Sequence, residues 1–204
     1  MEVFARSECS DQDRLVLEVR DYQPSDEQAW LRCRVLSFLG TAYFDDVIPA
    51  KKSPAFGAEL VAVDSEPFSE SWTSRWRGRL ATIDTIAVHP DHQRRGIGTR
   101  LLEQACSRAV GLGAATIEAW TRDDEPVLRW YRSRGFSESS HYLHVYADYY
   151  TSPREPTDPV QSRPGLEPIK VFLHAELGCG AEMRERFSRV HLCRRFVRPV
   201  GDTS

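Results

Sequence analysis

The stretch 88–102, VHPDHQRRGIGTRLL, places two glycines where a predicted strand passes into a predicted helix. Residues 80–88 are rich in β-branched side chains, which is typical of a buried strand. Apolar residues recur at helical spacing over 97–110, and glycines end that pattern. A strand that turns sharply into an amphipathic helix favours an α/β fold in which the first amides of the helix are unpaired.

Unpaired amides at the positive end of a helix dipole bind anions. Gly96 and Gly98 have no Cβ atoms, which leaves room for a phosphate group near the backbone. A dinucleotide loop would need a third glycine where this chain has Leu101, and the Gly-Lys-Ser/Thr of a P-loop is absent. The stretch therefore predicts a phosphate or pyrophosphate site that is neither of these. Three arginines add a local positive field there: Arg94, Arg95 and Arg100.

The order of the remaining elements indicates an α/β domain in which some strands are parallel. Residues 68–76 fit either a strand with one aromatic face, joined to the next strand by a turn at 77–79, or a loop. Residues 40–47 fit a loop or a short helix. Further strands are predicted at 15–19, 58–63, 115–120, 142–146, 170–174 and 190–197, and further helices at 24–38, 126–134 and 181–187.

Three segments follow from this pattern. Residues 1–150 form the core domain, and 151–169 form a linker or long loop whose first 18 residues hold five prolines. Residues 170–204 supply strands that complete or extend the sheet, and an insertion in the last hairpin is favoured over a second domain. Two alternatives stay open for these late segments: they shape an acceptor cleft, or they form a homodimer contact.

Composition excludes several classes of partner. A net charge of −3 over 204 residues gives no general case for nucleic-acid or membrane binding. The five cysteines are scattered, without a C-x-x-C pair, which is typical of reduced thiols. The N-terminal segment lacks the apolar core of a signal peptide, and no apolar run is long enough to span a membrane. We expect a cytoplasmic protein.

The segment Gln93–Gly98, QRRGIG, resembles the Q/R-x-x-G-x-G/A motif of the GNAT superfamily of acetyl-CoA-dependent N-acetyltransferases. The segments 86–90, IAVHP, and 130–136, WYRSRGF, are similar to the strand before that motif and to a late helix and turn of the family. The resemblance is strongest over 82–136. It implies a mixed central sheet flanked by helices, acetyl-CoA as the acyl donor and an amine as the acceptor. No metal is expected, because no cysteine or carboxylate joins the pairs His89/His92 and His141/His144 at ligand spacing.

The resemblance also implies how the coenzyme is held. Backbone groups of Ile86, Ala87 and Val88 would hold the pantetheine arm and the acetyl group. Where the family often has an asparagine before the late helix, this chain has Asp124, which we interpret as a helix cap. The pyrophosphate would lie against the loop that follows the strand: Gln93, Arg94, Arg95, Gly96, Ile97, Gly98, Thr99 and Arg100.

Acetyl transfer to an amine needs a base for the amine and a proton for the departing thiolate. By the resemblance, Tyr131 supplies that proton. Strand alternation puts Thr82, Asp84, Ile86 and Val88 on one face, which makes Asp84 the first candidate base, with strand-holding hydrogen bonds as the alternative reading. Glu118 on the neighbouring strand is the second candidate. His89 is expected to cap local structure rather than to act as the base.

The family places acceptors between an early loop and the late strands. Here the loop holds Tyr43, Phe44, Asp45 and Asp46, an acidic and aromatic group that suits a protonated amine. Core aromatics with solvated acids are the alternative. The leading prediction is an N-acetyltransferase for a small-molecule amine. A protein N-terminus or lysine as the acceptor, and an acyl-CoA-binding regulatory module without catalysis, remain as alternatives.

Overall fold

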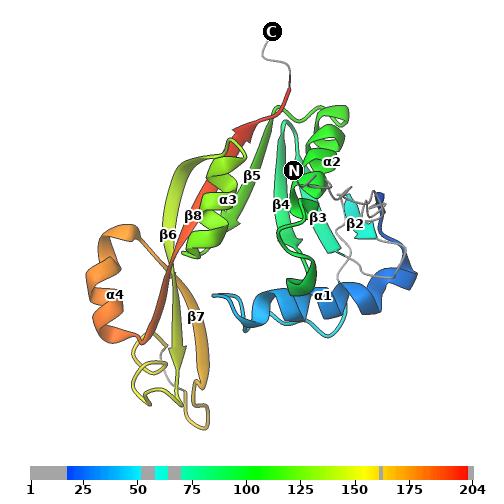
Figure 1. Ribbon diagram of the computed structural model, residues 1–204. Coiled ribbons are helices and arrows are strands. Elements are labelled where there is room, and N and C mark those ends of the chain that lie inside the picture. Colours follow the sequence, from blue (N-terminus) through cyan, green and yellow to red (C-terminus); the bar gives the residue numbers. More distant parts are fainter. Residues whose placement is uncertain (1–17, 52–57, 64–69, 161–162, 202–204) are drawn as a thin grey trace, which may run out of the picture.

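The computed structural model describes residues 18–51, 58–63, 70–160 and 163–201. Its main feature is a mixed eight-stranded sheet in the order β1-β2-β3-β4-β5-β8-β6-β7 (Figure 1). The strands are β1 Glu18–Asp21, β2 Glu59–Val63, β3 Glu70–Arg77, β4 Leu80–Ala87, β5 Thr116–Thr121, β6 Ser137–Asp148, β7 Lys170–Ala175 and β8 Arg189–Pro199. The helices are α1 Glu27–Leu39, α2 Ile97–Gly111, α3 Glu125–Ser133 and α4 Gly180–Arg186.

Strands β4 and β5 form a parallel pair, connected through α2. Their pairing begins at Leu80 and ends where Ile83 lies beside Ala119, although β4 and β5 both continue beyond that pair. Figure 1 shows the two strands close together at their starts and apart at their carboxyl ends. A crevice at the carboxyl ends of parallel strands is the usual ligand position in open α/β sheets.

Helices α2 and α3 pack on one face of the sheet, where they form the main core with β2, β4, β5 and β8. Apolar side chains at helical spacing face inward from α2, so burial of that face stabilises the helix. Helix α1 lies on the other face. There Arg34 donates a hydrogen bond to Thr85 Oγ1, and Ser37 donates one to the Val88 carbonyl. The α2 residues of the core are Ile97, Leu101, Leu102, Ala105 and Ala109.

A second, smaller core lies between α4 and the extended part of the sheet. Alternate residues of β6 point into it, and Phe187 closes it from the chain that follows α4. The β6 members are Leu143, Val145 and Ala147. The intervening residues of β6 must therefore project from the opposite face of the sheet.

The last three strands are not ordered in space as they are in the sequence. Strand β8 lies between β5 and β6 and pairs antiparallel with both, while β7 pairs with β6 at the edge of the sheet. The chain between β6 and β7 is tied to the body by Glu155, whose carboxylate accepts hydrogen bonds from the amides of Asp148 and Ser188. Residues 149–188 thus form an insertion between two strands of one sheet.

The mixed sheet flanked by helices is confirmed, and a strand or helix lies at each position predicted above. Residues 68–76 are a strand from Glu70 onward, joined to β4 by the turn at Gly78, and 40–47 form a loop. Parts of the predictions at 15–19 and 68–76 lie outside the described residues. Cys106, Cys179 and Cys193 carry free thiols, and Cys9 lies outside the described part of the chain. Among the described helices, none has the length and apolar character needed to cross a membrane.

Candidate active site

The loop between β4 and α2 presents a cradle for an anion. Gly96 caps the helix with a φ of 80°, and a Cβ atom placed there would meet nothing within 4 Å. The carbonyl of Gly96 accepts hydrogen bonds from the amides of Thr99 and Arg100, both at 3.1 Å. The first amides of α2 have no partner inside the helix, and Gly96 has no side chain that could occupy them. The residues present therefore fit a phosphate group at this helix N-terminus. The side chains of Arg94, Arg95 and Arg100 are exposed around it.

Gly98 has a different environment from Gly96. A Cβ atom at Gly98 would lie 3.5 Å from Val88 Cγ2 and 3.7 Å from Trp130 Cζ2. The missing side chain at 98 thus permits close packing of α2 against the end of β4 and against α3. Of these two glycines, only Gly96 borders open space that a ligand could occupy.

The strand that leads into the loop is held from two sides. The Val88 carbonyl accepts a hydrogen bond from Ser37 at 2.9 Å and one from the Gln93 side chain at 3.1 Å. His89 accepts from the amide of Asp91 and caps the short helix 90–92, which confirms its predicted structural role. Asp124 caps α3 by accepting from the amide of Val127 at 3.2 Å, and this prediction is confirmed as well.

The predicted alternation along β4 is wrong beyond Ile83. The register of β4 against β3 shifts, so that Ile83 lies opposite Ser74 and Thr85 lies opposite Thr73. Asp84 is the extra residue of this β-bulge, and its side chain is exposed. A bulge inverts the faces that follow it. Thr85 consequently faces α1, and Ile86 packs against the main core.

Asp84 nevertheless lies at the point where β4 and β5 separate. It is the first β4 residue beyond the last pair with β5, Ile83 beside Ala119. Bulges re-aim side chains next to functional sites.

Glu118 is held on the opposite face of β5 from the main core. Its neighbours Ile117 and Ala119 belong to that core, so the Glu118 side chain projects the other way. Only 8% of the residue is exposed. One carboxylate oxygen accepts from Thr82 at 2.9 Å and the other from Arg195 at 2.5 Å. Both oxygens are thus engaged by groups of the protein.

Tyr131 lies inside the main core on the α3 side of the sheet. Its ring stacks on Phe196 with the centroids 5.2 Å apart and meets the edges of Trp130 and Phe136. Burial raises the pKa of the Tyr131 phenol well above its ordinary value, with a smaller contribution from Tyr43. The phenol is therefore protonated at neutral pH. Because Glu118 projects from the other face, the structure does not bring these two candidates to the same side of the sheet.

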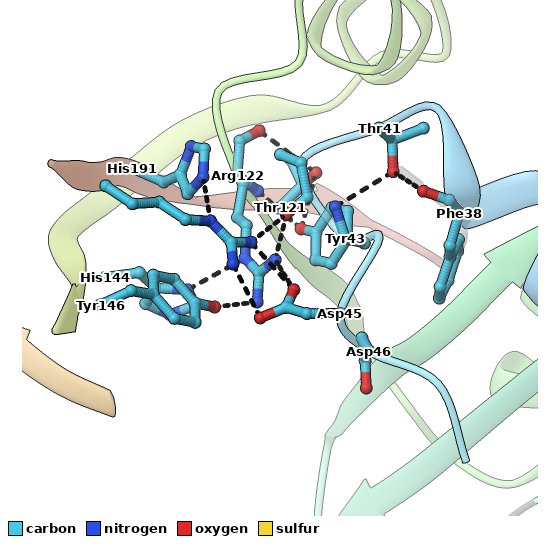
Figure 2. Close-up of polar contacts among 12 residues, drawn as sticks. Phe38, Thr41, Tyr43, Asp45, Asp46, Thr121, Arg122, His144, Tyr146 and His191 are labelled. Atoms are coloured by element: carbon cyan, nitrogen blue, oxygen red, sulfur yellow. Dashed lines mark hydrogen bonds and ion pairs between the residues drawn. The ribbon is translucent and has the colours of Figure 1, made fainter. Parts of the chain in front are cut away.

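The loop with the predicted acceptor residues is bound to the end of β5 and to the start of β8 (Figure 2). Tyr43 donates to Thr121 Oγ1 at 3.2 Å and accepts from the amide of Arg122 at 2.6 Å. Asp45 lies between two guanidinium groups, with Arg189 at 2.9 Å and Arg122 at 3.5 Å. The Arg189 hydrogen bond holds the pKa of Asp45 below its ordinary value.

Asp46 and Phe44 complete that loop. Asp46 pairs with Arg34 at 2.8 Å, whereas Phe44 is half-exposed and lies under the Arg189 guanidinium. With Asp45 also paired, both carboxylates of the loop are committed to arginines of the same chain. The loop is thus held in a fixed position at the carboxyl end of β5.

Arg122 lies at the centre of the contacts that hold this loop. Its side chain is 8% exposed and stands at the end of β5. The guanidinium donates to the Ala42 carbonyl, to the Tyr146 hydroxyl and, at 3.3 Å, to Nδ1 of His144. These partners come from β6 and from the loop after α1, so Arg122 joins three distant segments.

Arg122 was not predicted from the sequence, and its partners on β6 were predicted only as part of the late strands on the acceptor side. The one available signal was position, since Arg122 directly follows a strand whose carboxyl end opens on the crevice. His144, Tyr146 and Arg189 gave no local signal. Their role depends on strand pairing between segments more than 40 residues apart in the chain.

Replacing Arg122 with methionine is expected to lower the free energy of unfolding by about 3 kcal/mol, because buried acceptors lose a charged donor. Urea unfolding would measure the loss. Arg189→Met is the matched control, since Arg189 binds the same Asp45 but its side chain is 23% exposed. A loss from Arg189→Met as large as that from Arg122→Met would contradict the central place given to Arg122.

The lowered pKa of His144 leads to a prediction of how the stability of the protein depends on pH. Burial, and next the charge of Arg122, lower the pKa of His144 to about 4. In the unfolded chain a histidine titrates near ~6.5, so the unfolded state binds the proton more readily. The stability that neutral His144 contributes is present above that pH and is lost as the pH falls toward 4. We expect His144→Gln to unfold with a shallower loss of free energy between pH 6.5 and pH 4.5 than the parent chain, measured by urea titration at each pH. A parallel loss in the two proteins would contradict this.

The other histidines and the acidic residues do not form a metal-binding group. In the described ranges, no three His, Cys, Asp or Glu side chains are arranged so that they could hold a metal ion. The site is thus composed of the N-terminus of α2, the separated carboxyl ends of β4 and β5, a buried tyrosine, and a loop held in place by arginines.

These features define an α/β protein in which the open N-terminus of α2 follows the first of two parallel strands that separate at their carboxyl ends. Residues 57–136 match the model of the Acetyltransferase (GNAT) family. The chain is 40% identical over 81 residues to "N-alpha-acetyltransferase RimI" of Mycobacterium tuberculosis, a match that covers 38% of this chain and 50% of the relative. Residues 57–136 of this chain are thus similar in sequence to the GNAT family.

Solved structures agree in fold. The ribosomal-protein-S18-alanine N-acetyltransferase of Escherichia coli superposes with a TM-score of 0.58 at 14% identity, over 92% of this chain and 96% of that one. A protein of Salmonella typhimurium, solved with its cofactor acetyl-CoA, superposes with a TM-score of 0.53 at 13% identity, over 92% of this chain and 96% of that one. The curated relatives are matched over about half of their length.

Proposed function

We propose that this protein transfers an acetyl group from acetyl-CoA to a primary amine at the N-terminus of a polypeptide. The observation that carries the proposal is the cradle at Gly96, which opens beside the β4–β5 crevice in a chain that is similar in sequence to the GNAT family. When bound, acetyl-CoA supplies an activated acetyl group as a thioester. The steps below are the work of residues in this chain.

Binding is assigned to the β4–α2 connection. The first amides of α2 receive the pyrophosphate, with Arg94, Arg95 and Arg100 as a positive surround. Backbone groups of 86–88 are unpaired toward β5, since the β4–β5 ladder ends at Ile83, and we assign them to the arm that carries the acetyl group. Ser37 and Gln93 fix the Val88 carbonyl and thereby orient this part of the strand.

Two proton transfers accompany the acetyl transfer. Asp84 is the proposed base, because its exposed carboxylate follows the last β4–β5 pair; it takes the proton that the amine nitrogen loses as the nitrogen–carbon bond forms. The carbon–sulfur bond breaks, and Tyr131 gives its proton to the leaving sulfur. Its raised pKa keeps the phenol protonated at neutral pH, so that the proton is present at the hydroxyl when the sulfur leaves. Glu118 is proposed to position β4 and β8 rather than to act as a base, since Thr82 and Arg195 engage both of its oxygens.

The acceptor class differs from the leading expectation from the sequence. The relatives matched in sequence include an N-alpha-acetyltransferase of Mycobacterium tuberculosis and a ribosomal protein bS18-alanine N-acetyltransferase of Escherichia coli, and these names support a polypeptide acceptor over a small-molecule amine. The carboxylates that were expected to attract a small protonated amine, Asp45 and Asp46, are paired with arginines. A polypeptide N-terminus is the acceptor that this combination favours.

The test is release of free thiol from acetyl-CoA in the presence of peptides with free or blocked N-termini, with lysine-containing and small-molecule amines as further arms. Mass spectrometry would locate the acetyl group. We expect acetylation of the free α-amine. Binding of acetyl-CoA without acceptor-dependent thiol from any arm would overturn catalysis, and transfer to small amines alone would overturn the polypeptide acceptor.

A further inference from the structure

A continuous series of rings lies on the face of the sheet opposite α4. His144 pairs in register with His174 on one side and His191 on the other, and Tyr146 pairs with Phe172, so these side chains share a face. Neighbouring ring centroids are 4.6–5.2 Å apart from Trp120 through to Phe172. We call this surface the ring face; it consists of Trp120, Tyr142, His144, Tyr146, Phe172 and His174.

Packing between strands accounts for only part of these rings. Phe172 is 51% exposed, Trp120 is 37% exposed, and His174 is exposed as well. The helix of this region, α4, packs on the opposite face with Leu143 and Val145. A contiguous exposed apolar surface of this kind is typical of a binding site.

The ring face begins at the proposed site of transfer. Trp120 stands in β5 two residues before Arg122, and Tyr146 accepts a hydrogen bond from the Arg122 guanidinium. The loop that carries Asp45 forms one margin. On the β7 side of the ring face, the pairing of β7 with β6 ends at Ala175, and a hollow of about 380 Å³ lies there. The hollow is lined by His141, Tyr142, His174, Ala175, Glu176 and Leu177.

The size of the ring face suits a polypeptide. From Tyr142 to Tyr146 the strand rises by roughly 13 Å, and four neighbouring strands span roughly 14 Å. A surface of those dimensions would contact about four residues of an extended chain, which is more than a small amine would cover. The strands that carry it, apart from β5, also lie beyond the residues matched by the family model.

The electrostatic character of the ring face suits an uncharged group. Arg122 and Arg189, at its margin, are both paired with Asp45, and His191 is paired with Asp123. His144, in the middle, is neutral at physiological pH because its pKa is lowered to about 4. Exposed rings beside compensated charges favour an aromatic ring as the group that binds there.

We propose that the ring face binds an aromatic side chain close to the N-terminus of the polypeptide acceptor. The amine then lies at the β4–β5 crevice, and the first residues of the acceptor extend across β5, β8, β6 and β7. This inference rests on the proposed function and adds a sequence preference to it. The inserted strand β7 thus supplies specificity through Phe172 and His174, which take no part in the chemistry.

The test uses the full chain and a set of peptides with one Phe moved through positions 2 to 5 of an otherwise alanine and serine host sequence. We expect one position to lower the KM of the peptide about three- to ten-fold relative to the host, the range expected for one aromatic contact. Phe172→Ala and His174→Ala should remove that gain and leave the KM for acetyl-CoA unchanged. Leu166→Ala, which removes a 66% exposed side chain of the same insertion, is the matched control and should retain the gain.

The outcomes separate the two proposals. No acetylation of any peptide would remove the proposed function, whereas acetylation with no preference for Phe would overturn this inference alone. A gain that persists in Phe172→Ala and His174→Ala would also overturn it. If Phe172→Ala instead changes the mass of the particle in solution without changing peptide KM, the ring face joins two copies of the chain and the inference is wrong. Thermal unfolding of each variant confirms that the exposed substitutions leave the fold intact.

Discussion

Replacing Gly96 with glutamate is expected to weaken CoA binding at least about 100-fold, measured by isothermal titration calorimetry. Gly96 adopts a φ of 80°, in the region that side chains rarely occupy, and a Cβ atom there would point into open space beside the first amides of α2. A carboxylate in that space would occupy the anion cradle and repel the pyrophosphate. A penalty of roughly 3 kcal/mol suffices for this factor.

The chain offers a matched control at the other end of the same helix. Gly113 has a φ of 83°, and a Cβ atom there also meets nothing within 4 Å. Gly113→Glu therefore introduces the same backbone strain and the same charge, far from the cradle, and should retain CoA binding. If the two variants lose affinity equally, the effect comes from strain in α2 and the cradle at Gly96 is not the binding site.

The part of the site with a local sequence signal was predictable. The strand at 80–88, the glycine turn and the helix from Ile97 each depend on residues within a few positions of one another, and the structure has them where they were expected. The cap at Asp124 is equally local. Local chemistry fixes these features because capping, turn geometry and amphipathic spacing act within one or two helical turns.

The bulge at Asp84 could not be predicted in this way. Strict alternation assumes that each residue has one partner on the neighbouring strand, and the shift in register arises only when β3 pairs with β4. The consequence is large, because it inverts the faces of Thr85 and Ile86. A candidate base chosen by alternation therefore needed the paired strand before its direction could be known.

The arginine network and the ring face depend on contacts that are still more distant. Arg122 binds residues from the loop after α1 and from β6, and β8 enters the sheet between β5 and β6. The acidic residues of the loop look like an amine site when the sequence is considered alone. The structure shows instead that Asp45 is paired with Arg189.

Removing the hydroxyl of Tyr131 in the Tyr131→Phe variant is expected to lower kcat by about 10²- to 10⁴-fold, the usual contribution of a general acid. The ring that stacks on Phe196 and meets Phe136 is retained, so the core should stay packed and the affinity for acetyl-CoA should be unchanged. Tyr149→Phe, which removes a hydroxyl from a 37% exposed tyrosine outside the crevice, is the control and should keep the parent rate. An unchanged kcat in Tyr131→Phe would remove Tyr131 from the mechanism.

The leaving group distinguishes an acid from a residue that only shapes the core. A thiol of low pKa departs as a stable thiolate and gains little from a proton donor, so an acetyl thioester of an aryl thiol should depend far less on Tyr131 than acetyl-CoA does. If Tyr131 donates the proton, the ratio of parent to Tyr131→Phe rates falls toward one with the aryl thioester. A ratio that is equal for both donors indicates that the hydroxyl acts on structure, because distortion of the crevice would slow both reactions alike. The comparison of the two donors thus tests the buried phenol as an acid, independently of which amine accepts the acetyl group.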